Sequence, residues 1–108
     1  MKQWLWFVSL IWLGLSAASD MTAERQAELE NMLIQDCGSC HGLQFKGGLG
    51  PALLPQNLAG KPREFLLHSI LQGRAGTAMP PWNALLDAHE ANWMLDRLLT
   101  GFARGDKP

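Results

Sequence analysis

Apolar residues recur at helical spacing in three segments of the chain, and stretches rich in glycine and proline separate these segments. In the first segment, three apolar residues fall on one face of a helix: Leu29, Met32 and Leu33. Thr22 is a favourable N-cap, and Glu24 brings negative charge to the first turn, where it suits the helix dipole. The pattern predicts a helix over residues 22–36 that leads into the first cysteine.

The second helix is predicted from Pro62, a residue favoured at a first helical position, through "REFLLHSILQ" to Gly73, a plausible C-terminal stop. On either side lie predicted loops, residues 41–60 and the stretch "RAGTAMPPW". Repeated glycine and proline exclude a regular element from both loops.

The last helix begins with Asp87 and Glu90, which resemble a capping box, although serine or threonine is its usual first residue. An apolar stripe at helical spacing follows, made of Ala91, Met94, Leu95 and Leu98. The pattern predicts a helix over residues 88–100 that ends at Gly101. Because no stretch of residues 20–108 alternates like a strand, we expect an all-α fold of three to four helices with long loops.

The first 19 residues have the three-part layout of a secretory signal. Lys2 supplies positive charge, an apolar run covers residues 4–15, and small residues occupy 16–19. This run is shorter than the roughly 20 residues of a membrane span. We therefore predict a cleaved signal peptide (1–19), a domain over residues 20–108 and export to the periplasm, with no membrane contact after cleavage. An uncleaved N-terminal anchor is the alternative.

The overall composition fits one globular domain. The chain has 108 residues, of which 47% are hydrophobic and 18% charged. Its formal net charge of −1 argues against a protein that binds nucleic acid by neutralising phosphates. About 90 residues remain after the predicted signal. An apolar core of this size contributes little stability, so we expect an additional stabilising group or cross-link that involves the cysteines.

The only two cysteines, Cys37 and Cys40, stand in "CGSCH", with His41 directly after the second. A disulfide would close a very small loop and stabilise little. A thioredoxin-like pair needs a βαβ context, and tetrahedral zinc needs two further ligands at finger spacing; neither is present. The pattern C-x-x-C-H is typical of covalent c-type haem, in which two thiols add to the porphyrin vinyl groups and the histidine binds the iron.

With these helices and loops, the chain resembles a small class I cytochrome c over residues 20–101. More narrowly, "CGSCHG…KGGLGPAL…GRAGTAMPPW" resembles the NirC-type mono-haem cytochromes found beside haem-d nitrite reductases in denitrifying bacteria. The resemblance implies one covalent haem c and crossed N- and C-terminal helices.

The resemblance also implies site residues. His41 would be one axial ligand of the iron and Met79, in the Met-Pro motif, the other, with His68 as an alternative. The backbone carbonyl of Pro51 would accept a hydrogen bond from the axial histidine, and Trp82 would pack against the haem or line its mouth.

Two filled axial positions leave one-electron exchange as the expected activity, so we predict an electron carrier and no enzyme. It would be a monomer with transient redox partners, most directly nitrite reductase. An accessory role in haem d1 biosynthesis is the alternative, and a haem enzyme or gas sensor with an open sixth position is a third reading. Basic residues concentrate between positions 46 and 74: Lys46, Lys61, Arg63 and Arg74. Ordinary solvated surface explains them, and the sharper hypothesis is that they steer the protein onto an acidic partner.

Overall fold

The computed structural model describes residues 21–101, and within this range it contains helices and no strands. The elements are α1 (Ala23–Met32), η1 (Leu33–Cys37), α2 (Gly38–His41), α3 (Pro55–Leu58), α4 (Arg63–Gln72) and α5 (Ala88–Leu99). The all-α prediction is confirmed. The predicted signal peptide lies outside the described residues. Within them, no helix is long and apolar enough to span a bilayer.

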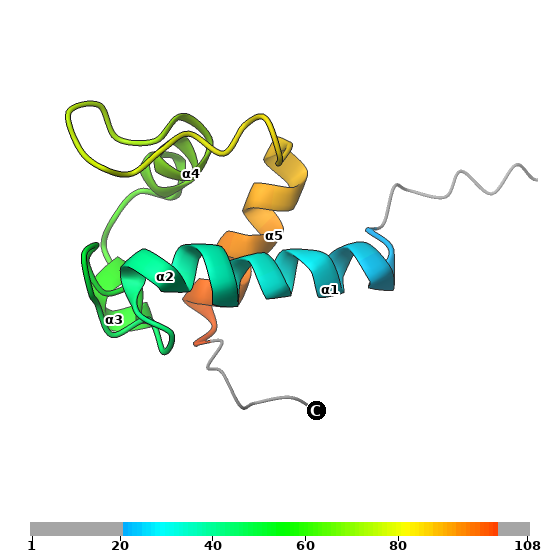
Figure 1. Cartoon of the computed structure of the whole chain (residues 1–108), viewed down its shortest axis with the longest axis horizontal. Helices are drawn as coiled ribbons and strands as arrows, with labels where there is room; N and C mark the ends of the chain where they lie inside the picture. Colours follow the sequence, from blue (N-terminus) through cyan, green and yellow to red (C-terminus); the bar gives the residue numbers. More distant parts are fainter. Residues whose placement is uncertain (1–20, 102–108) are drawn as a thin grey trace, which may run out of the picture.

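The first three elements form one continuous rod, drawn from blue to teal in Figure 1. It begins as predicted, because the side chain of Thr22 accepts a hydrogen bond from the amide of Arg25 at 3.1 Å. It does not stop at residue 36, however. The turn over Leu33–Cys37 is a π-helix, in which the amide of Gly38 donates to the carbonyl of Leu33, and helix then continues to His41.

The prediction of loop from residue 41 to residue 60 is therefore wrong at two places. His41 is the last residue of α2, and a single turn, α3, occupies residues 55–58. Pro55 is the first residue of this turn, and proline is favoured at a first helical position because its ring fixes φ near the helical value. Such short turns carry no apolar stripe, so the periodic pattern does not indicate them.

The other two helices agree closely with their predicted limits. Helix α4 follows Pro62 and ends at Gly73. Helix α5 has a complete capping box: Asp87 accepts from the amide of Glu90 at 2.8 Å, and the amide of Asp87 donates to the Glu90 carboxylate at 3.1 Å. All four residues of its predicted stripe are buried.

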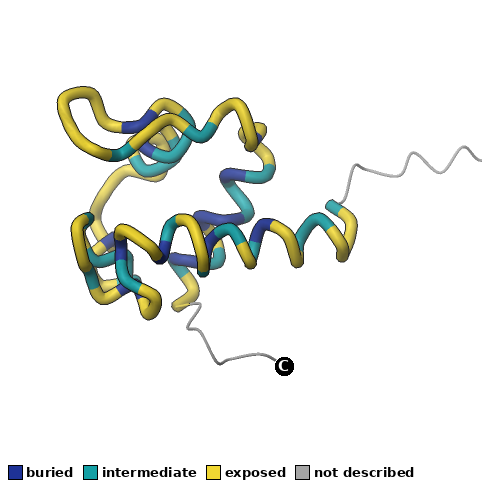
Figure 2. Tube along the Cα trace, viewed as in Figure 1, coloured by how far each residue is buried: buried dark blue, intermediate teal, exposed yellow. Residues whose placement is uncertain are grey.

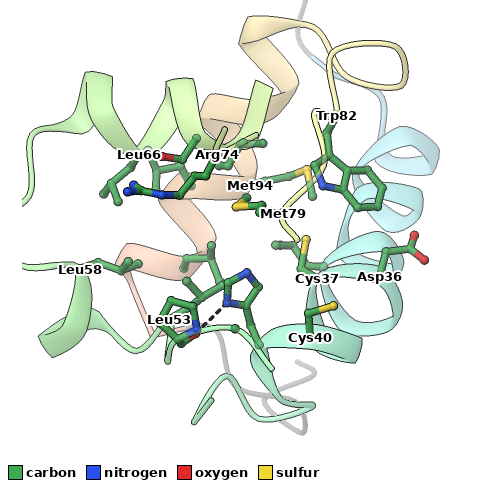
Figure 3. Close-up of a pocket in the computed structure, with 18 of the residues that line it drawn as sticks. Asp36, Cys37, Cys40, Leu53, Leu58, Leu66, Arg74, Met79, Trp82 and Met94 are labelled. Atoms are coloured by element: carbon green, nitrogen blue, oxygen red, sulfur yellow. Dashed lines mark hydrogen bonds between the residues drawn. The ribbon is translucent and has the colours of Figure 1, made fainter. Parts of the chain in front are cut away.

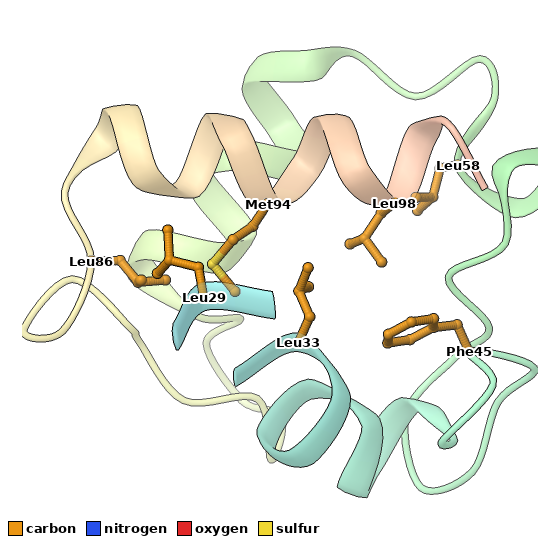
Figure 4. Close-up of a cluster of buried hydrophobic side chains, with 7 residues drawn as sticks. All are labelled: Leu29, Leu33, Phe45, Leu58, Leu86, Met94 and Leu98. Atoms are coloured by element: carbon orange, nitrogen blue, oxygen red, sulfur yellow. The ribbon is translucent and has the colours of Figure 1, made fainter. Parts of the chain in front are cut away.

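The core lies where α1 and η1 pack across α5 (Figure 4), which agrees with the expected crossing of the terminal helices. Seven buried side chains form it: Leu29, Leu33, Phe45, Leu58, Leu86, Met94 and Leu98. Figure 2 shows that buried positions follow the inner faces of the helices, while the loops are mostly exposed. Burying each of these side chains contributes about 1.5–3 kcal/mol.

Phe45 enters this core from the loop after α2 with an unusual backbone. Its φ is +58°, a value that non-glycine residues seldom adopt. The amide of Phe45 donates to the Gly42 carbonyl at 2.9 Å, and its carbonyl accepts from the amide of Leu53, also at 2.9 Å. Burial of the ring and these two bonds together hold the conformation.

Ion pairs join α5 to both of its neighbours. Arg97 pairs with Glu30 of α1 at 2.6 Å, and Arg63 of α4 pairs with Asp96 at 2.7 Å. Arg25 of α1 donates to the carboxylate of Glu90. The Arg25 guanidinium, with help from the Asp87 amide, holds the pKa of Glu90 below its usual value.

We expect Glu90→Gln to lower the thermal midpoint of the mature protein by up to about 4 °C at pH 7, because glutamine keeps the capping hydrogen bond but loses the charge. The lowered pKa in the folded state means that this pair stabilises the fold above the unfolded value near 4.3 and fades as the pH falls through the folded value. The difference between variant and parent should therefore shrink in acid, as measured by circular dichroism.

Glu24→Gln is the matched control, because Glu24 also stands in the first turn of a helix but forms no ion pair among the described residues. An equal decrease of the thermal midpoint in Glu90→Gln and Glu24→Gln would contradict a stabilising role of the Arg25–Glu90 ion pair.

Candidate functional site

A cavity of about 800 Å³ lies between the first helical rod, α4, α5 and the two long loops. This size falls in the range of roughly 300–1,000 Å³ found for ligand pockets. Five of the seven core side chains also line it: Leu33, Leu58, Leu86, Met94 and Leu98. The cavity is therefore continuous with the core. The structure brings all six predicted site residues to its lining: Cys37, Cys40, His41, Pro51, Met79 and Trp82.

The two cysteines reach the cavity from one side, because η1 and α2 carry them on adjacent turns of one rod (Figure 3). They form no disulfide with each other; Cys40 is exposed and Cys37 is partly buried. Burial, and to a smaller degree the charge of Asp36, raises the pKa of Cys37 to about 11. Burial of Cys37 in this wall thus disfavours its charged thiolate form.

His41 ends α2 and is buried, and its Nδ1 lies 2.7 Å from the carbonyl oxygen of Pro51. A carbonyl oxygen only accepts, so Nδ1 donates the hydrogen and Nε2 keeps its lone pair. A fixed hydrogen bond of this kind orients a metal-binding imidazole and raises its basicity. The structure contains the predicted hydrogen bond, whereas the role of His41 as an iron ligand stays a prediction.

Gly50 holds the backbone of the next loop against the His41 ring. A Cβ atom at this position would lie 2.9 Å from both Nδ1 and Cε1 of the ring. The amide of Gly50 donates to the carbonyl of Cys40 at 2.8 Å, which ties the loop to α2. The close approach of Gly50 thus allows the neighbouring Pro51 carbonyl to reach the ring.

The other wall carries Met79, on the loop between α4 and α5, with Trp82 three residues further along. His68, the alternative ligand, is exposed and does not line the cavity. Met32 and Met94 were expected in the core. Both also line the cavity, and Met94 is 1% exposed. The apolar pattern does not indicate that these methionines line a cavity, because this depends on which part of each helix faces the loops.

Three acidic or basic side chains stand among the cavity-lining residues: Asp36, Lys61 and Arg74. The Arg74 guanidinium lies 4.8 Å from the centre of the Phe65 ring, and the Lys61 ammonium lies 5.9 Å from it. In Figure 3, Arg74 lies across the cavity from Cys37 and Cys40. From the sequence, Lys61 and Arg74 were expected on the surface, either facing an acidic partner or simply solvated. Lys61 lies just before α4 and Arg74 just after it, and both approach the Phe65 ring of that helix beside the cavity.

These residues form a donor set that fits haem c. Two thiols stand on one side, an imidazole with a free Nε2 and a thioether line the cavity, and the walls are mainly apolar. The zinc alternative finds no support in residues 21–101, where no three side chains of His, Cys, Asp or Glu converge as a metal site.

Comparison with known proteins agrees with this reading. The family described as cytochrome c oxidase, cbb3-type, subunit III matches residues 24–96. Cytochrome c55X of Stutzerimonas stutzeri is 53% identical over 96 residues, which cover 89% of this chain and 85% of the relative. A solved structure of the c-type cytochrome NirC superposes with a TM-score of 0.75 at 56% identity, covering 78% of this chain and all of the other.

The fold, the cavity and these relatives define a c-type cytochrome, a class that implies haem c. Within that class, the chain belongs to the NirC-type cytochromes, so the narrower resemblance seen in the sequence is confirmed.

A different kind of relative covers a small part of a larger protein. Dihydro-haem d1 dehydrogenase of Pseudomonas aeruginosa is 38% identical over 66 residues, which span 57% of this chain and 13% of the dehydrogenase. A solved structure titled dihydro-haem d1 dehydrogenase NirN in complex with DHE superposes with a TM-score of 0.62 at 33% identity. It covers 73% of this chain and 17% of the other. The dehydrogenase thus contains a segment folded like this chain.

We expect Gly50→Ala to lower the free energy of unfolding of the haem-loaded protein by about 1–3 kcal/mol, because the added methyl group would collide with the His41 ring. Urea unfolding followed by absorbance measures the change. Gly76→Ala serves as the control: it strains a backbone of φ +76° but meets nothing within 4 Å. A Gly50 variant as stable as the parent would contradict the packing argument.

Proposed function

We propose that this chain is a periplasmic one-electron carrier with a single haem c, joined to Cys37 and Cys40 by thioether bonds. The observation that supports this most directly is the placement of His41 and Met79 on the lining of one cavity with both thiols. When bound, haem supplies reversible one-electron exchange at its iron. With an imidazole and a thioether as axial ligands, no position remains for a substrate, which argues for a carrier and against an enzyme.

The protein side chains set the properties of such a site. Pro51 fixes the ring of His41, and the soft sulfur of Met79 favours the reduced state and raises the potential. The apolar walls exclude water. The two carboxylates of a haem stand on the macrocycle edge opposite the thioether edge. Arg74, which lies across the cavity from the cysteines in Figure 3, is therefore suited to hold them, and Lys61 is a second cation on the cavity lining.

As the principal physiological role, we propose electron donation to nitrite reductase in denitrification. The kinship with NirC-type cytochromes supports this role. The encounter would be transient, with a monomeric carrier that approaches through the surface around the cavity mouth. The basic residues available for steering are fewer than the sequence suggests. Arg63 is engaged by Asp96 and Asn92, and Lys61 and Arg74 are assigned to the haem carboxylates, which leaves Lys46.

A second candidate role is electron exchange during haem d1 biosynthesis. The likeness to a segment of dihydro-haem d1 dehydrogenase favours this role. That enzyme contains, within its own chain, a segment with the fold of this protein. This chain, a separate protein with the same fold as that segment, is suited to exchange electrons with an enzyme of this kind. This role uses the same site and the same chemistry as the first.

The visible spectrum of the exported protein tests the proposed site. We expect one haem per chain by pyridine haemochrome and, in the oxidised form, the weak band at the red end that reports sulfur–iron ligation. Met79→Ala should abolish this band and lower the potential by a sizeable part of the roughly 0.8 V that axial ligands span. His68→Ala is the control and should change neither. A Met79 variant with an unchanged spectrum and potential would favour the reading with an open sixth position.

A deletion strain separates the two roles. If the chain donates to nitrite reductase, the strain should retain haem d1 in the reductase but reduce nitrite slowly. If the chain serves haem d1 biosynthesis, the specialised haem itself should be lost. Haem d1 extracted from purified reductase provides the measurement, and complementation with the parent gene provides the control.

A further inference from the structure

The loop that carries Met79 is attached to the end of α4 by backbone hydrogen bonds. The amides of Trp82 and Asn83 donate to the carbonyls of Ile70 and Leu71, each at 3.1 Å. These two carbonyls belong to the last turn of α4, where no helical partner remains for them. The returning loop therefore caps the helix, and the helix end fixes the returning loop.

Closer to Met79, the loop is fastened to itself. The carbonyl of Met79 accepts from the amide of Arg74 at 3.2 Å. The hydroxyl of Thr77 donates to the Arg74 carbonyl at 2.7 Å and accepts from the Met79 amide at 3.3 Å. Two of these three hydrogen bonds act on the backbone of Met79, so its position depends on Arg74 and Thr77, just after Gly73.

Gly73 is the point of contact between the helix end and this loop. It is buried, with φ +68°, and a Cβ atom on it would lie 2.6 Å from the Met79 carbonyl oxygen. The same atom would lie 2.8 Å from backbone atoms of Pro80 and of Pro81. These neighbours are backbone atoms of a proline pair, which cannot rotate aside as the end of a side chain does. Any side chain at position 73 must push the Met79–Pro81 segment away from α4.

We infer that Gly73 is a positioning residue for Met79: its missing side chain lets the Met79–Pro81 backbone rest directly on the end of α4 and so holds the thioether at the cavity. This inference rests on the proposed role of Met79 as an axial ligand. Gly73 lies at the end of α4, outside the Met-Pro motif. Its role would be to help Met79 keep the sixth coordination position of the iron filled.

The consequence concerns which small molecules the iron admits. An external ligand such as imidazole competes with the thioether, and its apparent affinity rises with the fraction of molecules in which the thioether has left. A variant in which the loop is displaced at Gly73 should therefore bind imidazole more tightly at its oxidised iron. The covalent attachment through Cys37 and Cys40 is on the opposite side of the cavity and should be unaffected.

The experiment compares Gly73→Ala with Gly76→Ala in the exported, haem-loaded protein. Gly76 lies in the same loop and has a similar φ of +76°, but a Cβ atom there meets nothing within 4 Å. Both variants place alanine at positive φ, but only the Cβ atom at position 73 meets the backbone of Met79 and the prolines. We expect Gly73→Ala to lose the red-end band and to bind imidazole about tenfold more tightly or better. Gly76→Ala should keep the band and the parent affinity within about threefold.

A second variant keeps the test decisive if Gly73→Ala does not mature. Thr77→Val removes both hydrogen bonds of the Thr77 hydroxyl without adding bulk, and should raise imidazole affinity by about threefold or more with haem content unchanged. Equal imidazole affinity in the parent, Gly73→Ala and Gly76→Ala would overturn the inference. If Gly73→Ala does not mature, a Thr77→Val variant with the imidazole affinity of the parent would overturn it. A parent protein that itself lacks the band would overturn the proposed ligation, and the inference with it, before any variant is compared.

Discussion

The packing of α1 and η1 across α5 is the contact on which the rest of the structure depends. Leu29 and Leu33 on one side meet Met94 and Leu98 on the other, and most of this cluster also forms the cavity wall. A domain of this size has few other apolar contacts to offer. A group bound in the cavity would therefore cover core side chains, and its binding would add to the stability of the fold.

The two sides of the cavity are built by the same physical device. On one side, Gly50 brings a loop backbone against the ring of His41, and on the other, Gly73 brings a loop backbone against the end of α4. In both places the absent side chain permits backbone contacts closer than any Cβ atom allows. The two chemically important side chains are thus positioned mainly by backbone contacts, to which the Thr77 hydroxyl adds one side-chain hydrogen bond at the Met79 amide.

The sequence predicted well those features that short segments determine. Thr22, Asp87 and Glu90 form caps within a few residues of themselves, and the stripe from Ala91 to Leu98 needs only one helix. The motif C-x-x-C-H indicates its chemistry without any tertiary structure. Features that depend on distant segments were missed. The positive φ of Phe45, the cavity contacts of Arg74 and the fit of Gly73 against Met79 each depend on how a loop returns to the fold.

The π turn between Leu33 and Cys37 affects how this chain should be compared with its relatives. A π turn closes its hydrogen bond one residue later than an α turn, so it accommodates one more residue between the core position Leu33 and the first cysteine. In a homologue whose rod is α-helical throughout, the residues before the motif would be offset by one. An alignment anchored on the cysteines would then pair Leu29 and Leu33 with the wrong neighbours, and would make the core of α1 look more variable than it is.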